Sequence, residues 1–286
     1  MKKTALFILT GLTLASCAFF KKNGVNVFTI DQDKQLGAQV AQQIASDPAQ
    51  YPIVDSVSNS ALYTYMYKVR NKILNSGKVQ HKNDFPWQVR IINNDTVLNA
   101  FCTPGGYIYV YTGILKYLDS EDELAGVLGH EIAHADLRHS TRQMTTMYGV
   151  DALLQMIAGK SDLIKTAASN LASLKFSRDH ESQADEMSVE YLCPTDYPAN
   201  AGGKFFQKLI AAGQGKTIQF LSDHPSPENR VETFNNTAKN LGCKGTNTHA
   251  AEYAAMKKLL NNIKAPGTKQ ENNGGALFQI HNGSRP

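Results

Sequence analysis

Apolar residues recur at helical spacing in the middle of this chain and define its most informative segment. Leu124, Val127 and Ile132 fall on one face of a helix, which predicts a stripe that packs into the core. Ser120 and Glu123 stand three residues apart just ahead of this stripe, which is the spacing of a capping box at a helix N-terminus. We therefore predict a helix that begins just after Ser120 and is held firmly by its buried face.

Periodic apolar segments on both sides of this one predict that helices make up most of the fold. The segment at residues 141–175 is apolar and helical in character. We consider three roles for it: a lid over a cleft, a membrane-touching surface, or plain core packing. Further helices are predicted at residues 31–45, 59–76, 201–213 and 227–241.

Two short extended segments precede the central helix. One spans residues 86–93, and the other spans residues 100–111 with a Thr-Pro-Gly-Gly turn at residues 103–106. Tyrosines alternate with aliphatic residues at positions 107–111, the period-2 pattern of a half-buried strand. Together these elements predict an α+β fold, mostly helical, with a small β-sheet beside the central helix.

The N-terminus has the pattern of a lipoprotein signal peptide. Two lysines precede an apolar run at residues 5–14, which is shorter than the roughly 20 residues that a membrane-spanning helix needs. The Leu-Ala-Ser-Cys sequence at residues 14–17 resembles a lipobox, in which Cys17 becomes the lipidated first residue. The alternative is an ordinary signal peptide that is cleaved near this position. Ala18 resembles the second mature residue of lipoproteins sorted to the outer membrane, so we expect a lipid anchor at its periplasmic face.

These signals divide the chain into four parts. They are a signal peptide at residues 1–16, a lipidated N-terminus and linker at residues 17–30, one domain at residues 31–264, and a polar tail at residues 265–286 that is expected to be disordered. Removing the signal peptide takes away Lys2 and Lys3, which lowers the formal net charge from +4 to +2. Because no basic stripe or aromatic platform is present in the sequence, nucleic acid is not an expected partner.

The cysteines do not have the spacing of a zinc cluster. With Cys17 lipidated, three remain, an odd number in an oxidising compartment. Cys102 lies in the strand region, and we expect it to be a buried free thiol. Cys193 and Cys243 each follow a predicted helix, and we consider a disulfide between them.

The candidate chemistry lies on the central helix, where residues 130–134 read His-Glu-Ile-Ala-His. His130 and His134 are four residues apart and share a helix face, so both imidazoles can bind one metal ion. Glu131 lies about 100° further round the helix, where it can face a metal-bound water without being a ligand. Two imidazoles with a carboxylate that can take a proton suit zinc. The alternative, two surface histidines, conflicts with the buried stripe of this helix.

A catalytic zinc site needs a third protein ligand. His139 follows His134 by five residues, about 140° away round a continuous helix, so we expect it to be structural or exposed. Glu181 and Asp185 are four residues apart, so Glu181 can bind the metal while Asp185 accepts the other ring N–H of a zinc-binding histidine. His180 is a rival ligand, but it has no second carboxylate at this spacing. Taken alone, the segment is also compatible with an ordinary solvated acidic helix face.

Further motifs accompany these residues in a fixed order. They are Asn99-Ala100-Phe101, the segment from Pro104 to Val110 with Gly113, Gly129 before His130, Arg178 and Ala184 around Glu181, and His224-Pro225 followed by Arg230. As a set, over residues 30–243, they resemble the gluzincin metallopeptidase family that includes the heat-shock protease HtpX and the CAAX prenyl protease. Within it, the chain is most similar to envelope lipoprotein proteases of Gram-negative bacteria. Unlike HtpX, the protease segment is not accompanied by membrane-spanning helices.

The resemblance implies roles that spacing alone does not assign. It implies that an edge strand near Asn99 and Ala100 lines the cleft and binds an extended substrate. It implies that His224, ahead of a helix predicted to begin at residues 226–227, either hydrogen-bonds the developing oxyanion or fills the open zinc position in a latent state. Arg230 would orient a carboxylate or stabilise negative charge. The alternative is that His224 and Arg230 only connect the C-terminal helix to the core.

We therefore predict a zinc metalloendopeptidase that is lipid-anchored in the Gram-negative envelope. His130, His134 and Glu181 are the expected Zn²⁺ ligands, and Glu131 is the expected general base. By resemblance, its partners are unfolded or misassembled envelope proteins. Two rival functions are a chaperone-like or latent scaffold lipoprotein that retains the zinc fold and an enzyme with a non-peptide substrate. The presence of Glu131 argues against the scaffold, which has no need of a base.

Overall fold

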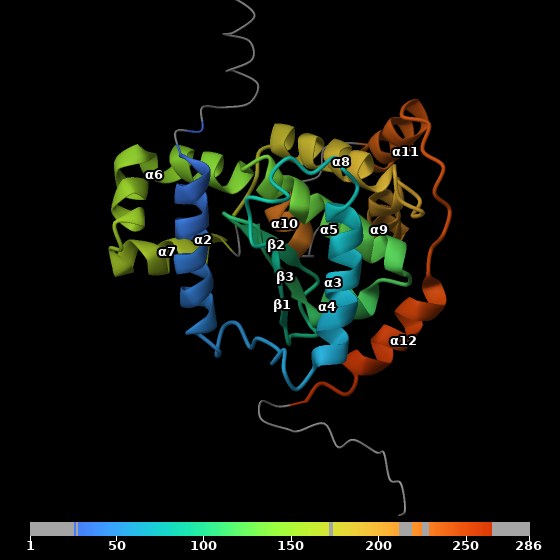
Figure 1. Ribbon diagram of the computed structural model, residues 1–286, viewed down its shortest axis with the longest axis horizontal. Coiled ribbons are helices and arrows are strands. Elements are labelled where there is room, and N and C mark those ends of the chain that lie inside the picture. Colours follow the sequence, from blue (N-terminus) through green and yellow to red (C-terminus); the bar gives the residue numbers. More distant parts are fainter. Residues whose placement is uncertain (1–25, 27, 172–173, 212–218, 225–228, 265–286) are drawn as a thin grey trace, which may run out of the picture.

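The computed structural model describes residues 26, 28–171, 174–211, 219–224 and 229–264, which form an α+β fold with one small sheet (Figure 1). Helices surround the sheet, and a central helix beside it carries the His-Glu-Ile-Ala-His sequence. The predicted fold class is confirmed. The helices are α2 (Ile30–Ala45), α3 (Ser60–Leu74), α4 (Thr112–Tyr117), α5 (Glu121–Asp136), α6 (His139–Ile157), α7 (Ser161–Leu171), α8 (Arg178–Leu192), α9 (Ala201–Ala211), α10 (Gln219–Asp223), α11 (Arg230–Asn240) and α12 (Ala250–Leu260).

Most predicted elements occur close to their predicted positions, but some boundaries differ. The helix predicted to begin at residues 226–227 corresponds to α11, which begins at Arg230, and residues 225–228 lie outside the described chain. The short helices α4 and α10 and the C-terminal helix α12 were not predicted. Cys17 and the tail at residues 265–286 also lie outside the described residues, so the predicted signal peptide, lipidation and tail stay predictions.

The sheet has three strands in the order β1-β3-β2, which leaves β2 at an edge. Strand β1 (Gln88–Ile92) pairs parallel with β3 (Tyr107–Tyr111), and β2 (Ala100–Thr103) pairs antiparallel with β3. The prediction that β3 is half-buried is wrong, because all five of its residues are buried. One face joins the core around α5, and the tyrosine face packs in a second core cluster with residues of α2, α6 and α7. Helices on both faces therefore exclude water from the strand.

Helix α5 is the centre of the fold, and all of its residues are buried. It packs against α8 and α9 along its length and also touches α3 and β2. The approach to α8 is close because Gly129 has no side chain: a Cβ there would lie 2.7 Å from the Ser188 hydroxyl oxygen. This contact brings the two helices that carry the candidate ligands together.

The N-terminus of α5 is built differently from the predicted capping box. Ser120 is the N-cap, but its hydroxyl donates a hydrogen bond to the Asp122 carboxylate and none of the helix amides bonds to it. The Glu123 carboxylate accepts from the amide of Asp119 at 3.0 Å instead of from the N-cap amide. Lys204 on α9 pairs with Asp122 at 2.6 Å. The prediction is wrong because this turn is buried, so neighbouring elements supply the partners that a capping box supplies on a surface helix.

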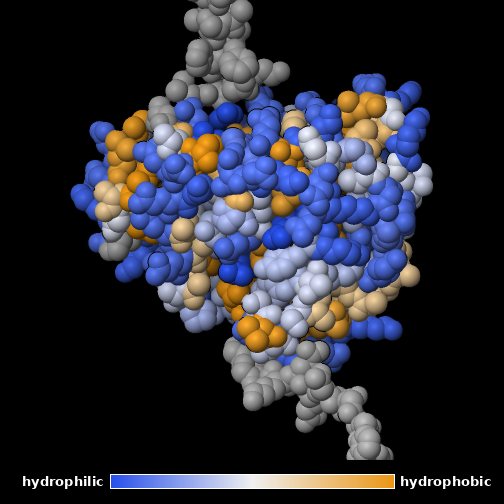
Figure 2. Space-filling model, in the orientation of Figure 1, coloured by the Kyte–Doolittle hydropathy of each residue, from blue (hydrophilic) through white to orange (hydrophobic). Residues whose placement is uncertain are grey.

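The described residues of the predicted segment 141–175 contain most of α6 and all of α7, which pack with α2 on one side of the molecule (Figure 1). Met144, Leu153 and Met156 are buried in the second core cluster, which favours core packing among the three predicted roles. Helix α6 is kinked at Gly149, whose φ of 76° lies in the left-handed region. Met147 remains exposed on its outer face, and apolar side chains are visible over α6 in Figure 2.

In the described part of the chain, none of the helices combines the length and the apolar character that crossing a membrane requires.

The structure contains the disulfide that we considered between Cys193 and Cys243. It ties the C-terminus of α8 to the segment that follows α11, and these are the helices that carry Glu181 and Arg230. Cys102 on β2 is a buried free thiol, as predicted, and burial holds its pKa well above the usual value.

Removing this disulfide is expected to lower the free energy of unfolding by about 2–4 kcal/mol, because it closes a loop between residues 50 positions apart in the unfolded chain. Urea unfolding of a Cys193→Ser, Cys243→Ser double variant measures the loss. A reductant should shift the midpoint of the wild-type protein and leave that of the double variant unchanged. A double variant as stable as the oxidised wild type would contradict the expectation.

Candidate metal centre

Helix α5 presents two imidazoles to one point in the interior. His130 and His134 are both buried, and their Nε2 atoms lie 3.0 Å apart, as the four-residue spacing predicts. The ring of His134 also stacks on Phe176, with 4.0 Å between the ring centroids. Both rings are therefore fixed by packing with one nitrogen each pointing at the same place.

Helix α8 supplies a carboxylate at that place. Ser177 caps this helix by accepting a hydrogen bond from the amide of His180, so the helix begins one turn before the site. The Glu181 carboxylate lies 3.4 Å from His130 Nε2 and 3.5 Å from His134 Nε2. His180, the rival ligand, instead stacks on His139 and is not part of this group.

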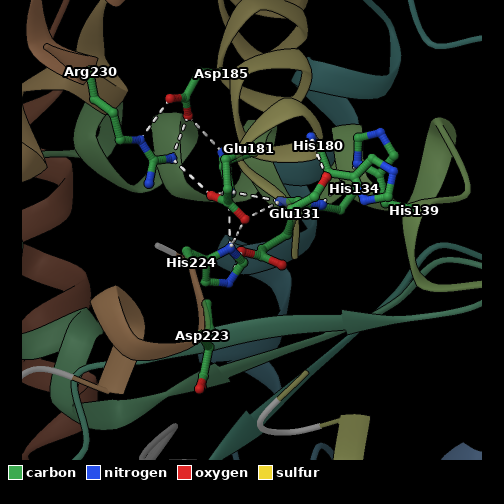
Figure 3. Close-up of polar contacts among 12 residues, drawn as sticks. Glu131, His134, His139, His180, Glu181, Asp185, Asp223, His224 and Arg230 are labelled. Carbon is green, nitrogen blue, oxygen red and sulfur yellow. Dashed lines mark hydrogen bonds and ion pairs between the residues drawn. The ribbon is translucent and has the colours of Figure 1, made fainter. Parts of the chain in front are cut away.

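His224, directly after α10, brings a third imidazole into the same group (Figure 3). Its Nδ1 lies 3.3 Å from His130 Nε2 and 3.1 Å from Glu181 Oε1. The ring is buried and stacks on Phe220, with 4.5 Å between the centroids. Donor atoms of His130, His134, Glu181 and His224 all lie within 4.8 Å of one another.

The spacing of these atoms fits a zinc ion. Four donors at bond lengths of about 2.0–2.1 Å form a tetrahedron with edges of about 3.3 Å. The contacts that link His130 Nε2 to the other three donor residues measure 3.0, 3.4 and 3.3 Å. Glu181 Oε2 is buried without a hydrogen-bond partner among the described residues, as expected for a metal-binding oxygen. The donor set of imidazoles and a carboxylate is also the one that zinc prefers.

The charge states of these side chains also suit a cation. Burial lowers the pKa of His134 to about 3, which keeps the imidazole neutral and its lone pair available. Burial alone would raise the pKa of Glu181, but the neighbouring His224 and His130 hold it well below the usual value. Burial lowers the pKa of His130, yet Asp185 and Glu181 outweigh this and raise it to about 9. A positive charge is therefore favoured here, as a proton on His130 or as a metal ion.

Asp185 and Arg230 support the ligands from behind. Asp185 Oδ1 lies 2.9 Å from His130 Nδ1, which directs the Nε2 atom of that ring at the metal position. Arg230, from α11, donates to both Asp185 oxygens at 2.7 and 2.6 Å, and its guanidinium lies 3.3 Å from Glu181 Oε2. Burial would raise the pKa of Asp185, but Arg230 and His130 lower it, so the carboxylate stays ionised.

The support of His134 was not predicted from the sequence. His139 is buried, and its Nδ1 lies 3.0 Å from His134 Nδ1, while its Nε2 lies 3.2 Å from the Gln183 amide oxygen. Burial holds the pKa of His139 well below the usual value, so this ring is neutral. A neutral His139 can accept a hydrogen bond from His134 Nδ1–H and donate one from its own Nε2–H to the Gln183 side-chain oxygen. The Nε2 atom of His134 then keeps its lone pair for a metal.

His139 is a structural residue outside the donor group, as predicted, but the continuous helix assumed for residues 134–139 is wrong. Helix α5 ends at Asp136, and Arg138 has a left-handed backbone with a φ of 60°. This residue interrupts the helix, and α6 begins at His139, whose Nδ1 lies 3.0 Å from that of His134. No residue in this short connection, such as a glycine or proline, marks the break in the sequence.

Glu131 lies next to the ligand group without belonging to it (Figure 3). Its carboxylate is fully buried, and neither oxygen has a hydrogen-bond partner among the described residues. Its Oε1 atom lies 3.6 Å from His224 Nε2. Burial raises the pKa of Glu131 above the usual value, which makes it a better proton acceptor than a solvated carboxylate.

The predicted substrate-binding pair lies beside this site at the start of the edge strand. Asn99 and Ala100 are buried, and Asn99 donates from Nδ2 to the carboxylate of Asp223, the residue before His224. The structure thus brings the strand and the His224 segment together. The role of this pair in substrate binding stays a prediction.

Comparison with known proteins gives a consistent family. The sequence profile described as Peptidase family M48 matches residues 64–238, which contain every candidate metal and base residue named above. The Mitochondrial metalloendopeptidase OMA1 of Schizosaccharomyces pombe is 29% identical over 218 residues, covering 72% of this chain and 61% of that protein. The Beta-barrel assembly-enhancing protease of Yersinia pestis is 30% identical over 231 residues, covering 74% of this chain and 45% of that protein.

A protein of the same name from Escherichia coli K12 is 27% identical over 234 residues, covering 76% of this chain and 46% of that protein. The matches thus extend over most of this chain but over less than two thirds of the length of each relative.

Proposed function

This chain belongs to peptidase family M48, and on that premise we propose that it is a zinc-dependent endopeptidase that cleaves unfolded proteins. The observation that carries this proposal is the buried group of His130, His134 and Glu181 with Glu131 beside it. The names of the relatives, a metalloendopeptidase and a protease, agree with it. The part of the predicted function that the family supports is therefore that of a zinc metalloprotease.

The roles of the side chains follow from their positions. Bound zinc would supply Lewis acidity toward the peptide carbonyl and make a water molecule more acidic. Glu131 has a raised pKa, and its oxygens have no hydrogen-bond partner in the described part of the chain, so it accepts the proton of the attacking water and returns it to the leaving amine. Asp185 and His139 hold the rings of His130 and His134 in place through their outer nitrogens. Arg230 holds Asp185 ionised and balances the charge of Glu181.

A cleavage assay on the purified full chain tests this function. β-Casein, an unfolded protein, is incubated with the enzyme, and mass spectrometry identifies the new termini. An endopeptidase produces internal fragments that disappear when a chelator is added and return when zinc is restored. The rival functions, a scaffold lipoprotein or an enzyme with a non-peptide substrate, produce none.

We propose that His224 closes the metal site in the resting protein. Its Nδ1 lies 3.3 Å from His130 Nε2 and 3.1 Å from Glu181 Oε1, so it would fill the position that a zinc ion held by His130, His134 and Glu181 would otherwise offer to water. An imidazole at this position competes with water and with the substrate carbonyl. The position of His224 therefore supports a latent resting state and not a role in binding the oxyanion. The same position is the observation that favours the alternative function, a scaffold lipoprotein, for the protein at rest.

Replacing His224 with alanine is therefore expected to raise the basal rate of β-casein cleavage by about tenfold or more, because the fourth position opens. The initial rate at equal zinc content measures the effect. If His224 instead stabilises the oxyanion, the same substitution lowers kcat by about 10²–10³. An unchanged rate would contradict both roles.

We propose that the protein acts in the Gram-negative envelope, held to the periplasmic face of the outer membrane by a lipid on Cys17. The lipobox-like sequence at residues 14–17 supports this location, as does the similarity to proteases named for enhancing β-barrel assembly. Misassembled envelope proteins are then the proposed substrates.

Labelling with a palmitate analogue tests the lipid anchor. The label should be present in the wild type and lost in Cys17→Ala, and a labelled Cys17→Ala variant would exclude lipidation at Cys17.

A further inference from the structure

The edge of the sheet beside the metal centre is already bonded at the point where a substrate strand would add. The amide of Tyr111 donates to the carbonyl of Asn99 at 3.1 Å, so Asn99 directs its backbone toward β3. Because backbone groups alternate along an antiparallel pair, the residues on either side of Asn99 direct theirs away from β3. The carbonyl of Leu98 and the amide of Ala100 therefore point away from β3, toward the outer edge of the sheet.

Neither of these two groups is free to pair with a substrate. The carbonyl of Leu98 accepts a hydrogen bond from the amide of Phe220, at the beginning of α10, at 3.2 Å. The amide of Ala100 donates to the side-chain oxygen of Asn99 at 2.9 Å. One acceptor and one donor of the edge are thus occupied by the chain itself.

The same contacts lead to His224. Asn99 uses its other side-chain atom, Nδ2, to donate to Asp223 Oδ2 at 2.9 Å, and both residues are buried. The amide of His224 donates to the carbonyl of Phe220 at 2.8 Å, so one helical turn joins the edge contact to the metal contact. The ring of Phe220 also stacks on that of His224. Phe220, Asp223 and His224 therefore belong to one helical turn that touches both the edge strand and the metal position.

We propose that binding of a substrate strand to the edge and withdrawal of His224 from the metal position are coupled through Asn99 and Asp223. This inference rests on the proposed function. It explains how the metal site is opened and which substrates open it. A strand that pairs with Leu98 and Ala100 must replace two hydrogen bonds. One joins the Leu98 carbonyl to the amide of Phe220, and the other joins the Ala100 amide to the side-chain oxygen of Asn99. Turning the Asn99 side chain away also breaks its bond to Asp223. Both changes remove contacts of the turn that carries His224, whose Asp223 carbonyl still accepts from the amide of Phe176 at 3.4 Å.

The coupling selects the substrate by its backbone. An extended segment of an unfolded protein replaces the lost hydrogen bonds with its own amide and carbonyl groups, so its binding offsets the cost of opening. A short peptide that reaches only the metal position cannot do so. The specificity that follows is for unfolded chains long enough to form a β-strand along the edge, with little dependence on side chains. Asn99 and Asp223 are positioning residues in this account, because they act through His224.

Asn99→Asp isolates the coupling contact. The new carboxylate can still accept from the amide of Ala100, but it has lost the donor that bonds Asp223 and places two carboxylates together. Asp223→Asn is the conservative partner, because its amide oxygen can still accept from Asn99 Nδ2. Asp223→Ala removes the contact from the other side and serves if Asn99→Asp does not fold.

X-ray absorption of the zinc-loaded full chain counts the imidazoles at the metal. We expect three in the wild type and in Asp223→Asn, and two in Asn99→Asp and Asp223→Ala. Cleavage of a fluorogenic tetrapeptide should rise by about tenfold in the latter two, the size expected for losing a hydrogen bond to a charged group, while the preference for β-casein over the tetrapeptide falls. Three imidazoles and an unchanged preference in both variants would overturn the coupling.

Amide hydrogen exchange tests the same coupling without turnover. In zinc-loaded Glu131→Gln, β-casein should increase exchange at the amide of Phe220 and keep the amide of Ala100 protected. Casein that binds while Phe220 stays protected would overturn the proposal. The failure of the proposed function has a different result, because then His224→Ala, in which the metal position is open, cleaves neither casein nor the tetrapeptide.

Discussion

Glu131→Gln is expected to abolish proteolysis while leaving the zinc in place. The carboxylate is the group positioned to take the proton of the attacking water, and a general base contributes about 10²–10⁴ to the rate of such a reaction. Glutamine has the same shape but cannot accept that proton. Because Glu131 is not one of the four clustered donors, the ligand set is unchanged. The rate of β-casein cleavage should fall by at least that factor, with zinc content equal to that of the wild type.

The matched control is the same substitution at Glu186, an exposed residue on α8, the helix that carries Glu181. Glu186→Gln should cleave casein at the wild-type rate, which separates loss of the base from a general loss of charge near the site. Near-normal turnover by Glu131→Gln would mean that the proton is accepted elsewhere and that the mechanism is wrong.

The double variant His130→Ala, Glu181→Ala is expected to lose both zinc and activity. It removes two of the three predicted ligands, including the carboxylate that neutralises part of the metal charge. His134 and His224 alone do not make a site that retains zinc through purification. Elemental analysis should find about one zinc per chain in the wild type and less than about a tenth of that in the variant.

His180→Ala controls for the loss of a nearby imidazole. His180 stacks on His139 but is not among the clustered donors, so its removal should leave the zinc content unchanged. Retention of zinc by the double variant would contradict the ligand assignment even if the protein were inactive.

The local part of the site could be predicted from the sequence because helical spacing fixes it. Two residues four apart on a helix share a face, and this alone predicts that His130 and His134 converge and that Asp185 lies on the same side as Glu181. Both relations hold in the structure. That these two faces meet depends on the packing of α5 on α8, whose close approach at Gly129 was not predicted from the sequence.

Features that depend on distant parts of the chain could not be predicted in this way. The alternation of tyrosine and aliphatic residues at positions 107–111 predicts a strand. Whether the second face of this strand is buried depends on α2, α6 and α7, which pack there. The contact of His139 with His134 depends on a left-handed backbone at Arg138 that no local residue type requires. The position of His224 came from family resemblance, since nothing in its own segment indicates that α10 lies against the edge strand.

The most direct test of the central claim is a zinc titration of the metal-free protein, with cleavage of β-casein as the readout. The account predicts no cleavage without metal, a rate that rises in proportion to added zinc, and saturation at about one zinc per chain, the stoichiometry of a single catalytic site. His224→Ala should follow the same curve with a higher plateau. Cleavage by the metal-free protein, or zinc bound at this stoichiometry with no cleavage by either protein, would contradict the account.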